Sequence, residues 1–358
     1  MEAIESVLDQ SFRSFELIVV DDGSTDGTEA AVAQFDDHIR YERREHRGVA
    51  AARNVGLHLA RGHVLAFIDS DNLWLRDHLD VVVAALRARP QALLASTCEG
   101  FITAGRMNAG DAVVSDPLPR LLAANFVGSP SCVATRRRAL EAIGGFDEEL
   151  EVAEDADAWL RLAVRGPFAF VRRRTAVLRQ AADSLLLRGR REGLYLEAWE
   201  RIAARMPAEL RAARRHHLVD RARGSVHFAA ALRALAEHDD PALRRELGAA
   251  CRLFPELSGE PGLVSGRLRV NLPGSNVPFE RLRHLATAAV AWPEPASDTA
   301  TVLRLSAAGA ALRLGRAATA VRLVAGLPPG AALSLGRRAL PLARSALARR
   351  RSRRRIRA

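Results

Sequence analysis

The chain has 358 residues, 48% of them hydrophobic and 27% charged, which suffices for about two packed domains and excludes a wholly disordered protein. The net charge of +11 fits a nucleic acid, an anionic membrane surface or a phosphorylated ligand as partner. It also fits the Ala, Leu and Arg bias of a GC-rich genome, which implies no partner. Aromatic residues make up only 5% and no stacking motif lies among the arginines, so we expect no nucleic-acid binding.

The predicted elements alternate between strands and helices over the first half of the chain. The chain starts within an amphipathic helix, because Ile4, Val7 and Leu8 recur at helical spacing. Short apolar runs predict strands at residues 15–20, 39–43, 63–68, 92–96, 128–135 and 168–173. Helical patterns lie between them at residues 29–35, 48–60, 75–88, 136–144 and 154–166. This alternation predicts an α/β fold with a doubly wound, mostly parallel sheet flanked by helices.

The second half of the chain has a different character. Ala, Leu and Arg patterns predict helices over residues 184–255, and again at 302–324 and 330–350. We therefore predict three parts: an α/β domain over residues 1–180, a mainly helical region of unknown role over 181–343, and a basic tail over 344–358.

The cysteines and the apolar runs bear on the compartment. Cys98, Cys132 and Cys251 are far apart and have no metal-binding spacing, so we expect reduced, buried thiols in a reducing compartment. The opening "MEAIESVLDQ" lacks the basic start of a signal peptide, and no run of about 18 apolar residues predicts a transmembrane helix. We expect a cytoplasmic protein.

Three acidic clusters lie at or near predicted strand ends, where ligands bind in open α/β sheets. Asp21 and Asp22 can accept hydrogen bonds from a nucleobase or ribose, or can simply form a turn. Asp69 and Asp71 form an Asp-x-Asp loop. Such a loop suits Mg²⁺ or Mn²⁺ bound together with a diphosphate, although a capped turn explains it as well.

The third cluster precedes a predicted amphipathic helix. Glu154 and Asp155 can stabilise the N-terminus of that helix by about 0.3–1 kcal/mol, or one of them can act as a general base. The residues alone leave both interpretations open.

Taken in order, these clusters resemble glycosyltransferase family 2, whose members have the GT-A fold. The matching segments over residues 1–171 are "AIESVLDQSFRSFELIVVDDGSTDGT", "RGVAAARNVGLHLARGHVLAFIDSDNLW" and "GGFDEEL…EDADAWLRL". The resemblance implies a metal-dependent, inverting transferase of the hexosyltransferase type. It would move a sugar from a nucleoside-diphosphate-sugar to an acceptor hydroxyl in polysaccharide, glycolipid or cell-envelope synthesis.

The resemblance also implies roles for single residues. Asp22, with Asp21 beside it, matches the acid that contacts the nucleobase, and Arg53 matches a basic residue of the nucleotide pocket. Asp69 and Asp71 match the metal-binding pair, with Asp71 as the direct ligand.

On the acceptor side, Asp155 matches the catalytic base and Glu154 is its neighbour. The segment from Gly144 to Asp147 matches a loop near the acceptor, which would be a saccharide or a lipid-linked molecule.

Three features depart from the family pattern. Members begin with a strand and a Tyr-Asn loop, whereas Met1 falls within the helix that follows, so we expect neighbouring strands to have unpaired edges. Asn72 stands where the family often has an acid. The C-terminal half has no motif that we can assign.

Two alternatives follow from these observations. The expected lack of the first strand favours a non-catalytic nucleotide-binding or scaffold protein derived from the fold, whereas Asp22, Asp71 and Asp155 favour the enzyme. The basic tail fits peripheral association with the inner face of an anionic membrane, at about 1 kcal/mol per well-placed Arg, or a solvated tail.

Overall fold

The computed structural model describes most of residues 1–255. The residues outside the described part are 36, 98–111, 123–124, 180–184, 186–188, 190–193, 238 and 256–358. The chain forms two compact units, residues 1–188 and 189–358, and each is described by itself. The predicted domain boundary at residue 180 precedes the boundary between these units.

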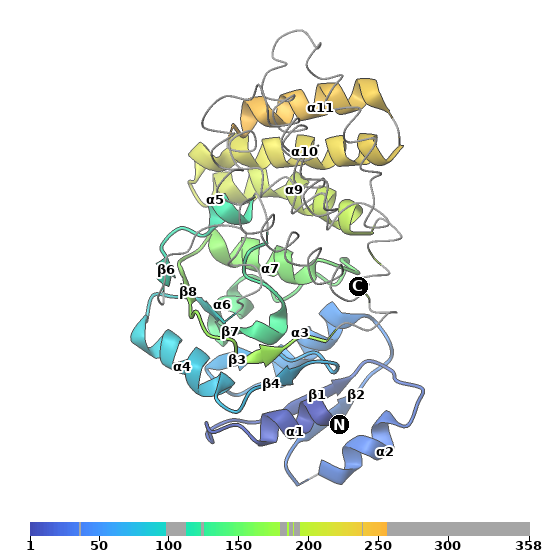
Figure 1. Ribbon diagram of the computed structural model, residues 1–358, viewed down its shortest axis with the longest axis vertical. Coiled ribbons are helices and arrows are strands. Elements are labelled where there is room, and N and C mark those ends of the chain that lie inside the picture. The colour runs from blue at the N-terminus through green and yellow to red at the C-terminus, as the bar shows by residue number, and fades with distance from the viewer. Residues whose placement is uncertain are drawn as a thin grey trace, which may run out of the picture. The chain divides into compact units, whose positions relative to one another are not determined.

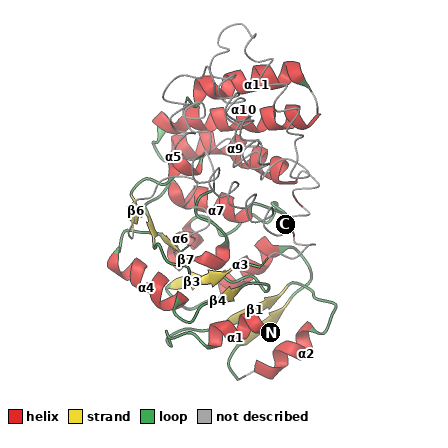
Figure 2. Ribbon diagram, in the orientation of Figure 1, coloured by secondary structure: helices red, strands yellow, loops and turns green. Residues whose placement is uncertain are grey.

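The first unit alternates helices and strands (Figures 1 and 2). Its helices are α1 (Glu2–Leu8), α2 (Thr28–Val32), α3 (Val49–Leu59), α4 (His78–Ala88), α5 (Leu118–Leu121), α6 (Arg137–Ala142) and α7 (Glu154–Ala163). Its strands are β1 (Ile18–Asp21), β2 (Arg40–Arg43), β3 (Val64–Ala66), β4 (Leu73–Trp74), β5 (Leu94–Ser96), β6 (Ala112–Val114), β7 (Val133–Arg136), β8 (Phe168–Phe170) and β9 (Ala176–Val177).

The largest sheet has five strands in the order β3-β7-β5-β8-β6. It is mixed: β5 and β8 are parallel, while β7 is antiparallel to both β3 and β5, and β6 is antiparallel to β8. Strands β3, β5 and β8 therefore share one direction, and their carboxyl ends lie at the same edge. The α/β class predicted from the sequence is confirmed. The expectation of a mostly parallel sheet is wrong for this sheet, since three of its four strand pairs are antiparallel.

Strands β1 and β2 form a separate parallel sheet, with Ile18 opposite Arg40 and Asp21 opposite Arg43. Within the described residues, β1 and β3 each pair with a strand on one side only. Ile18, Val19 and Val20 are only partly buried, in contrast to the fully buried β5 and β8. This arrangement agrees with the expectation of unpaired strand edges.

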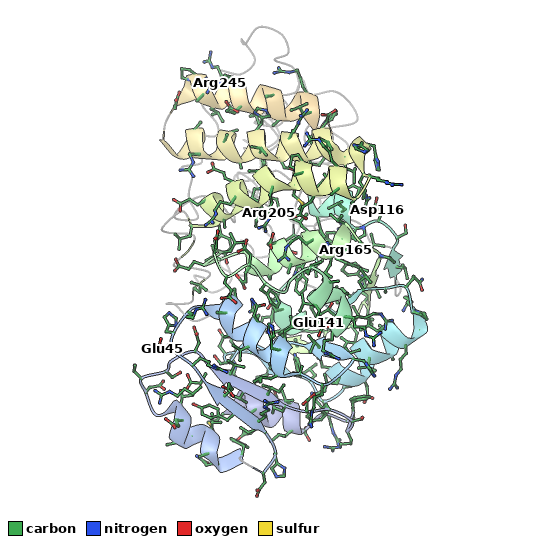
Figure 3. The ribbon with its side chains drawn as sticks, turned by 180° about the vertical axis from the view of Figure 1, so that it is seen from behind. Glu45, Asp116, Glu141, Arg165, Arg205 and Arg245 are labelled. Atoms are coloured by element: carbon green, nitrogen blue, oxygen red, sulfur yellow. The ribbon has the colours of Figure 1, made fainter. Side chains whose placement is uncertain are left out.

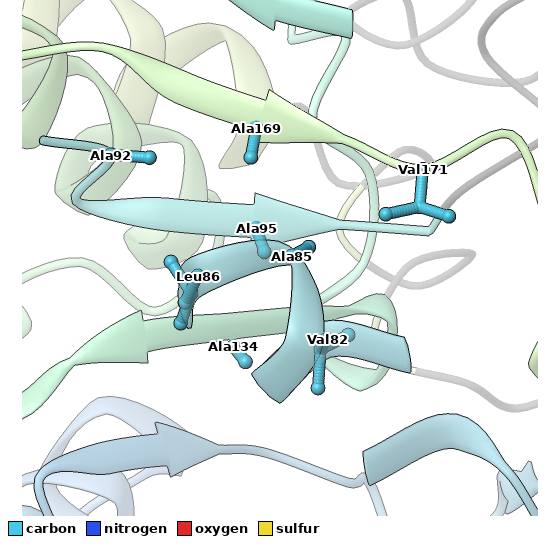
Figure 4. Close-up of a cluster of buried hydrophobic side chains, with 8 residues drawn as sticks. All are labelled: Val82, Ala85, Leu86, Ala92, Ala95, Ala134, Ala169 and Val171. Atoms are coloured by element: carbon cyan, nitrogen blue, oxygen red, sulfur yellow. The ribbon is translucent and has the colours of Figure 1, made fainter. Parts of the chain in front are cut away.

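The core of the five-stranded sheet lies under α4 (Figure 4). Apolar residues of α4 at positions 82, 85 and 86 recur at helical spacing and form one buried face. They pack against the small residues Ala95, Ala134 and Ala169 of three neighbouring strands, which are 0% exposed. Small strand residues let the helix lie close to the sheet. Val64 and Ala66 of β3, the strand that precedes Asp69, pack against the same cluster.

Several short elements were not predicted. Strands β4, β6 and β9 and helix α5 have two to four residues each, and β6 and α5 lie between the strands predicted at residues 92–96 and 128–135. Such short elements are stabilised by contacts with distant segments, as when β6 pairs with β8. Local sequence patterns therefore do not predict them.

The second unit is helical where it is described, with α9 (Leu194–Ala212), α10 (Val219–Glu237) and α11 (Asp240–Leu253). An ion pair joins Arg233 of α10 to Glu200 of α9, and a hydrogen-bonding contact of 2.8 Å joins His227 of α10 to Glu246 of α11. The predicted helices at 302–324 and 330–350 and the basic tail lie outside the described residues.

Cys132 and Cys251 are buried, as expected, whereas Cys98 lies outside the described residues. No helix among the described residues is both long and apolar enough to cross a membrane.

Candidate active site

Arg53 of α3 lies between two of the predicted acidic clusters. Its Nη2 donates to Asp69 Oδ1 at 2.7 Å, and its Nη1 donates to Glu154 Oε1. The Arg53 side chain is 11% exposed, and its guanidinium lies 5.6 Å from the centre of the Phe146 ring. Burial acts to lower the pKa of Arg53, but the charges of Glu154 and Asp69 outweigh it and raise the pKa. One charged guanidinium thus joins the Asp-x-Asp turn to the Glu-Asp pair.

The Asp69 carboxylate is held on both oxygens by protein donors. Besides Arg53 on Oδ1, the Ser131 hydroxyl lies 3.1 Å and the Asn72 amide 3.2 Å from Oδ2. Ser129 adds a longer contact of 3.4 Å to the same oxygen. Asp69 is therefore fixed in place before any ligand binds.

Asp71 has a different environment. Its side chain is exposed, and among the described residues no side chain is hydrogen-bonded or ion-paired to it. Partial burial and the nearby charge of Asp69 raise the pKa of Asp71, while the positive charge of Arg179 acts in the opposite direction. Its oxygens are available to a ligand.

Asn72 is buried, at 5% exposure, and its amide is fully hydrogen-bonded. The Nδ2 group donates to Asp69 and to the Ser131 hydroxyl, and Oδ1 accepts from the Arg179 backbone N–H at 2.9 Å. A carboxylate at this position could not donate to Asp69 and would place a like charge beside it. These contacts explain why an amide suits this position in this chain.

These donors are compatible with a divalent cation that arrives with a diphosphate. Mg²⁺ and Mn²⁺ bind through one or two carboxylates and take their other ligands from phosphate and water. Asp71 offers a carboxylate with no side-chain partner in the described part of the chain, and Asp69 lies two residues away. Among the described residues, no group of three or more His, Cys, Asp or Glu side chains could hold a metal by itself.

Glu154 and Asp155 begin α7, after Ala153 in a left-handed conformation with φ 63°. Glu154 is 7% exposed and is bound to Arg53. Asp155 is half-buried and accepts from its neighbour's N–H, that of Ala156, at 2.6 Å. Burial and the charge of Glu154 raise the pKa of Asp155 to about 7, although Arg53 opposes the shift. A carboxylate with this pKa can accept a proton near neutral pH.

The loop from Gly144 to Glu148 is held from two helices. Asn54 of α3 accepts from the Phe146 N–H at 2.8 Å and donates to the Phe146 carbonyl at 2.9 Å. Arg161 of α7 donates to the Gly145 carbonyl at 2.8 Å and pairs with Asp157, which is 0% exposed. The loop predicted to lie near the acceptor is thus fixed beside the start of α7.

Asp21 and Asp22, at the end of β1, both have protein partners. Asp21 is buried and accepts from the Ser24 N–H at 2.8 Å and the Tyr41 hydroxyl at 2.6 Å. Although burial acts to raise the pKa of Asp21, these hydrogen bonds lower it overall.

Asp22 binds the loop before α3, at the residues that follow Glu45, which is labelled in Figure 3. It accepts from the N–H groups of Arg47 and Gly48 at 2.9 and 2.8 Å, and His46 lies 2.8 Å from it. Its side chain is 22% exposed, so it keeps contact with solvent.

The structure therefore brings Arg53, Asp69, Glu154 and Asp155 into one network, with Asp71 at its exposed side, whereas Asp21 and Asp22 hold a neighbouring loop. Sequence reasoning missed Ser131, Asn54 and Arg161. Asn54 follows Arg53 in the matched "AARN" segment, and that adjacency is the signal that could have found it. Arg161 lies within the matched segment "EDADAWLRL", four residues after Asp157, which is a similar signal. Ser131 carries no such signal.

Comparisons with known proteins show which family this chain resembles. Residues 1–144 match the profile of the family described as Glycosyl transferase family 2. An uncharacterized glycosyltransferase of Rickettsia felis is 43% identical over 83 residues, which is 23% of this chain and 14% of that protein. The Escherichia coli enzyme WfgD, named a UDP-Glc:alpha-D-GlcNAc-diphosphoundecaprenol beta-1,3-glucosyltransferase, is 38% identical over 86 residues, which is 24% of this chain and 34% of the enzyme.

Among solved structures, S. aureus TarS 1–349 in complex with UDP-GlcNAc superposes with a TM-score of 0.53 at 19% identity, covering 88% of each chain. A likeness at this identity shows a shared fold. The N-terminal part of this chain, residues 1–144, resembles glycosyltransferase family 2. The matches span well under half the length of the first curated relatives.

Proposed function

We propose that the protein is a metal-dependent, inverting glycosyltransferase that moves a sugar from a nucleoside-diphosphate-sugar to an acceptor hydroxyl. The observation that carries this proposal is the bridge of Arg53 between Asp69 of the Asp-x-Asp turn and Glu154, the neighbour of Asp155. This bridge supports the proposal, because it links the turn proposed to bind the diphosphate to the residue that precedes the proposed base.

In the proposed reaction, Asp155 takes the proton of the acceptor hydroxyl as that oxygen bonds to the anomeric carbon. The bond from this carbon to the diphosphate oxygen breaks, and its electron pair leaves with the nucleoside diphosphate. Because the acceptor attacks opposite the leaving group, one displacement inverts the configuration. A pKa of about 7 lets Asp155 accept the proton near neutral pH.

Charge on the departing diphosphate would be stabilised at the Asp-x-Asp turn. A bound Mg²⁺ or Mn²⁺ would supply a Lewis acid there. Asp71 would be its direct ligand, with Asp69 beside it. Arg53 keeps Asp69 and Glu154 in place, and Asp22 with Asp21 shapes the pocket proposed for the nucleobase.

The names of the relatives suggest a donor and an acceptor class. WfgD is named for UDP-Glc and a lipid-linked acceptor, and the TarS structure contains UDP-GlcNAc. UDP sugars are therefore the first donors to test, and a saccharide or lipid-linked acceptor of the cell envelope fits the proposal. We also propose a cytoplasmic location, with the basic tail at the inner face of the membrane.

The test is release of nucleoside diphosphate by the purified full chain from UDP-glucose, UDP-GlcNAc and GDP-mannose. We expect release with Mn²⁺ or Mg²⁺ from at least one donor and none in EDTA. Asp71→Ala should lose the metal-stimulated release. Metal-stimulated release that persists in this variant would overturn the role of Asp71.

A non-catalytic nucleotide-binding or scaffold protein is the second candidate, favoured by the single-sided pairing of β1 and β3. Calorimetry with nucleoside diphosphates and Mn²⁺ separates the two functions. Tight binding without turnover of any donor or acceptor would favour the scaffold.

A further inference from the structure

We propose that Arg179 binds the diphosphate of the donor and that Asn72 is the positioning residue that holds it beside Asp71. This inference rests on the proposed function. It adds a positively charged side chain to the site. This side chain lies outside the segments that resemble the family, which fall within residues 1–171, since residue 179 follows β9 in the sequence.

The pairing of two short strands brings Arg179 to the turn that holds Asp71. Strands β4 and β9 are antiparallel, with Leu73 opposite Val177 and Trp74 opposite Ala176. Two residues before Leu73 the chain forms the turn that holds Asp71, and two residues after Val177 comes Arg179, so this pairing brings Arg179 to that turn.

A side-chain hydrogen bond fixes this position beyond the end of the strands. The Arg179 backbone N–H donates to Asn72 Oδ1 at 2.9 Å, and Asn72 is anchored in turn on Asp69 and on Ser131. Because Asn72 and Ser131 are 5% and 0% exposed, this anchor lies within the packed part of the unit. The Arg179 backbone is therefore attached to the Asp-x-Asp turn itself.

The Arg179 side chain is free to change partners. Its guanidinium pairs with Glu2, but the two side chains are 42% and 66% exposed, and ion pairs this exposed stabilise little. The positive charge of Arg179 also acts on Asp71. A guanidinium matches two phosphate oxygens at once, whereas the Glu2 carboxylate competes for it. Donor binding would therefore exchange Glu2 for diphosphate oxygens.

The test is calorimetry of the full chain with UDP and UMP, each with Mg²⁺ and in EDTA. We expect Arg179→Ala to weaken UDP binding about tenfold or more and UMP binding less, because UMP lacks the second phosphate. Arg179→Lys should recover part of the loss. Glu2→Gln should tighten UDP binding about two- to fivefold, because it removes the competing carboxylate. Asn72→Ala should also weaken UDP binding, because it removes the acceptor that holds the Arg179 backbone while leaving the Arg179 side chain unchanged.

Arg173→Ala is the matched control. Arg173 is another exposed arginine after β8, at 60% exposure, but its side chain pairs with Asp77. This substitution should leave UDP binding unchanged. Equal UDP affinity in wild type and Arg179→Ala, or an equal loss for UDP and UMP, would overturn the inference. If the wild type binds no nucleoside diphosphate, the proposed function fails first and this inference fails with it.

Discussion

Asp69 and Asp71 lie two residues apart, yet their carboxylates have opposite surroundings. Asp69 is bound by Arg53, Ser131 and Asn72, whereas Asp71 is exposed. Asp69 therefore contributes to folding, and Asp71 is available for a ligand. This difference can be measured without any substrate.

Substitution of each acid by Ala should separate the two roles. Asp69→Ala leaves the largely buried Arg53 with one carboxylate in place of two, so we expect a loss of about 3 kcal/mol in the free energy of unfolding. Asp71→Ala should change it by less than about 0.5 kcal/mol. Urea denaturation of both variants measures this, and equal losses would contradict the assignment.

The pKa of Asp155 predicts opposite pH dependences for activity and stability. Activity needs the carboxylate, so kcat/KM should rise with pH up to an apparent pKa of about 7. Stability should change in the other direction, because a pKa raised from about 4 in the unfolded chain means that the folded state binds the proton more tightly. Between about pH 4 and 7, this group therefore lowers the free energy of unfolding as the pH rises.

Two measurements check this prediction. A pH–rate profile should show the ascending limb, and a thermal melt series should show that Asp155→Asn gains stability relative to wild type as the pH is raised from 4 to 8. A gap in melting temperature that stays constant with pH would contradict the raised pKa.

At the scale of elements, the loop before α7 depends on two consecutive glycines in left-handed conformations. Gly144 and Gly145 have φ of +80° and +76°. A Cβ on Gly145 would lie 2.4 Å from Asn54 Oδ1, whereas a Cβ on Gly144 would meet nothing within 4 Å. The two positions share backbone strain and differ in the space available.

This pair provides a matched test of the loop. Gly144→Ala should cost only the strain of about 1–2 kcal/mol. Gly145→Ala should cost more than that, because it also displaces Asn54 from the Phe146 N–H, and it should lower kcat by moving the start of α7. Chemical denaturation and turnover of both variants measure this difference. Equal losses in both variants would show that the contact with Asn54 is unimportant.

The sequence predicts those elements whose residues carry a local pattern. Apolar runs predict β3, β5 and β8, and helical spacing predicts α3 and α7. Strands β4 and β9, of two residues each, exist only because they pair with each other across about 100 residues of chain. The single-sided pairing of β1 and β3 could be predicted only through the family resemblance.

The same limit applies to the site. Asp69, Asp71, Glu154 and Asp155 are found from motifs because each motif is continuous in the sequence. Ser131 contacts Asp69 from 62 positions away in the sequence, and Arg179 contacts Asn72 from 107 positions away. No local pattern reveals contacts between such distant positions.

At the scale of the whole molecule, the net charge of +11 is concentrated in part in residues 344–358, which are mostly Arg. If this tail binds an anionic membrane, its removal should reduce co-sedimentation with phosphatidylserine vesicles several-fold. Vesicles of phosphatidylcholine alone serve as the control. Equal sedimentation of both forms would exclude the tail from membrane binding.

The central claim is that Asp155 is the base of a sugar transfer from a nucleotide donor. The most direct measurement compares turnover of the preferred nucleotide sugar by wild type and by Asp155→Asn at pH 8, with donor affinity measured alongside by calorimetry. The expected result is a fall in kcat of about 100-fold to 10,000-fold with donor affinity within about threefold of wild type. Unchanged turnover in Asp155→Asn would contradict the claim.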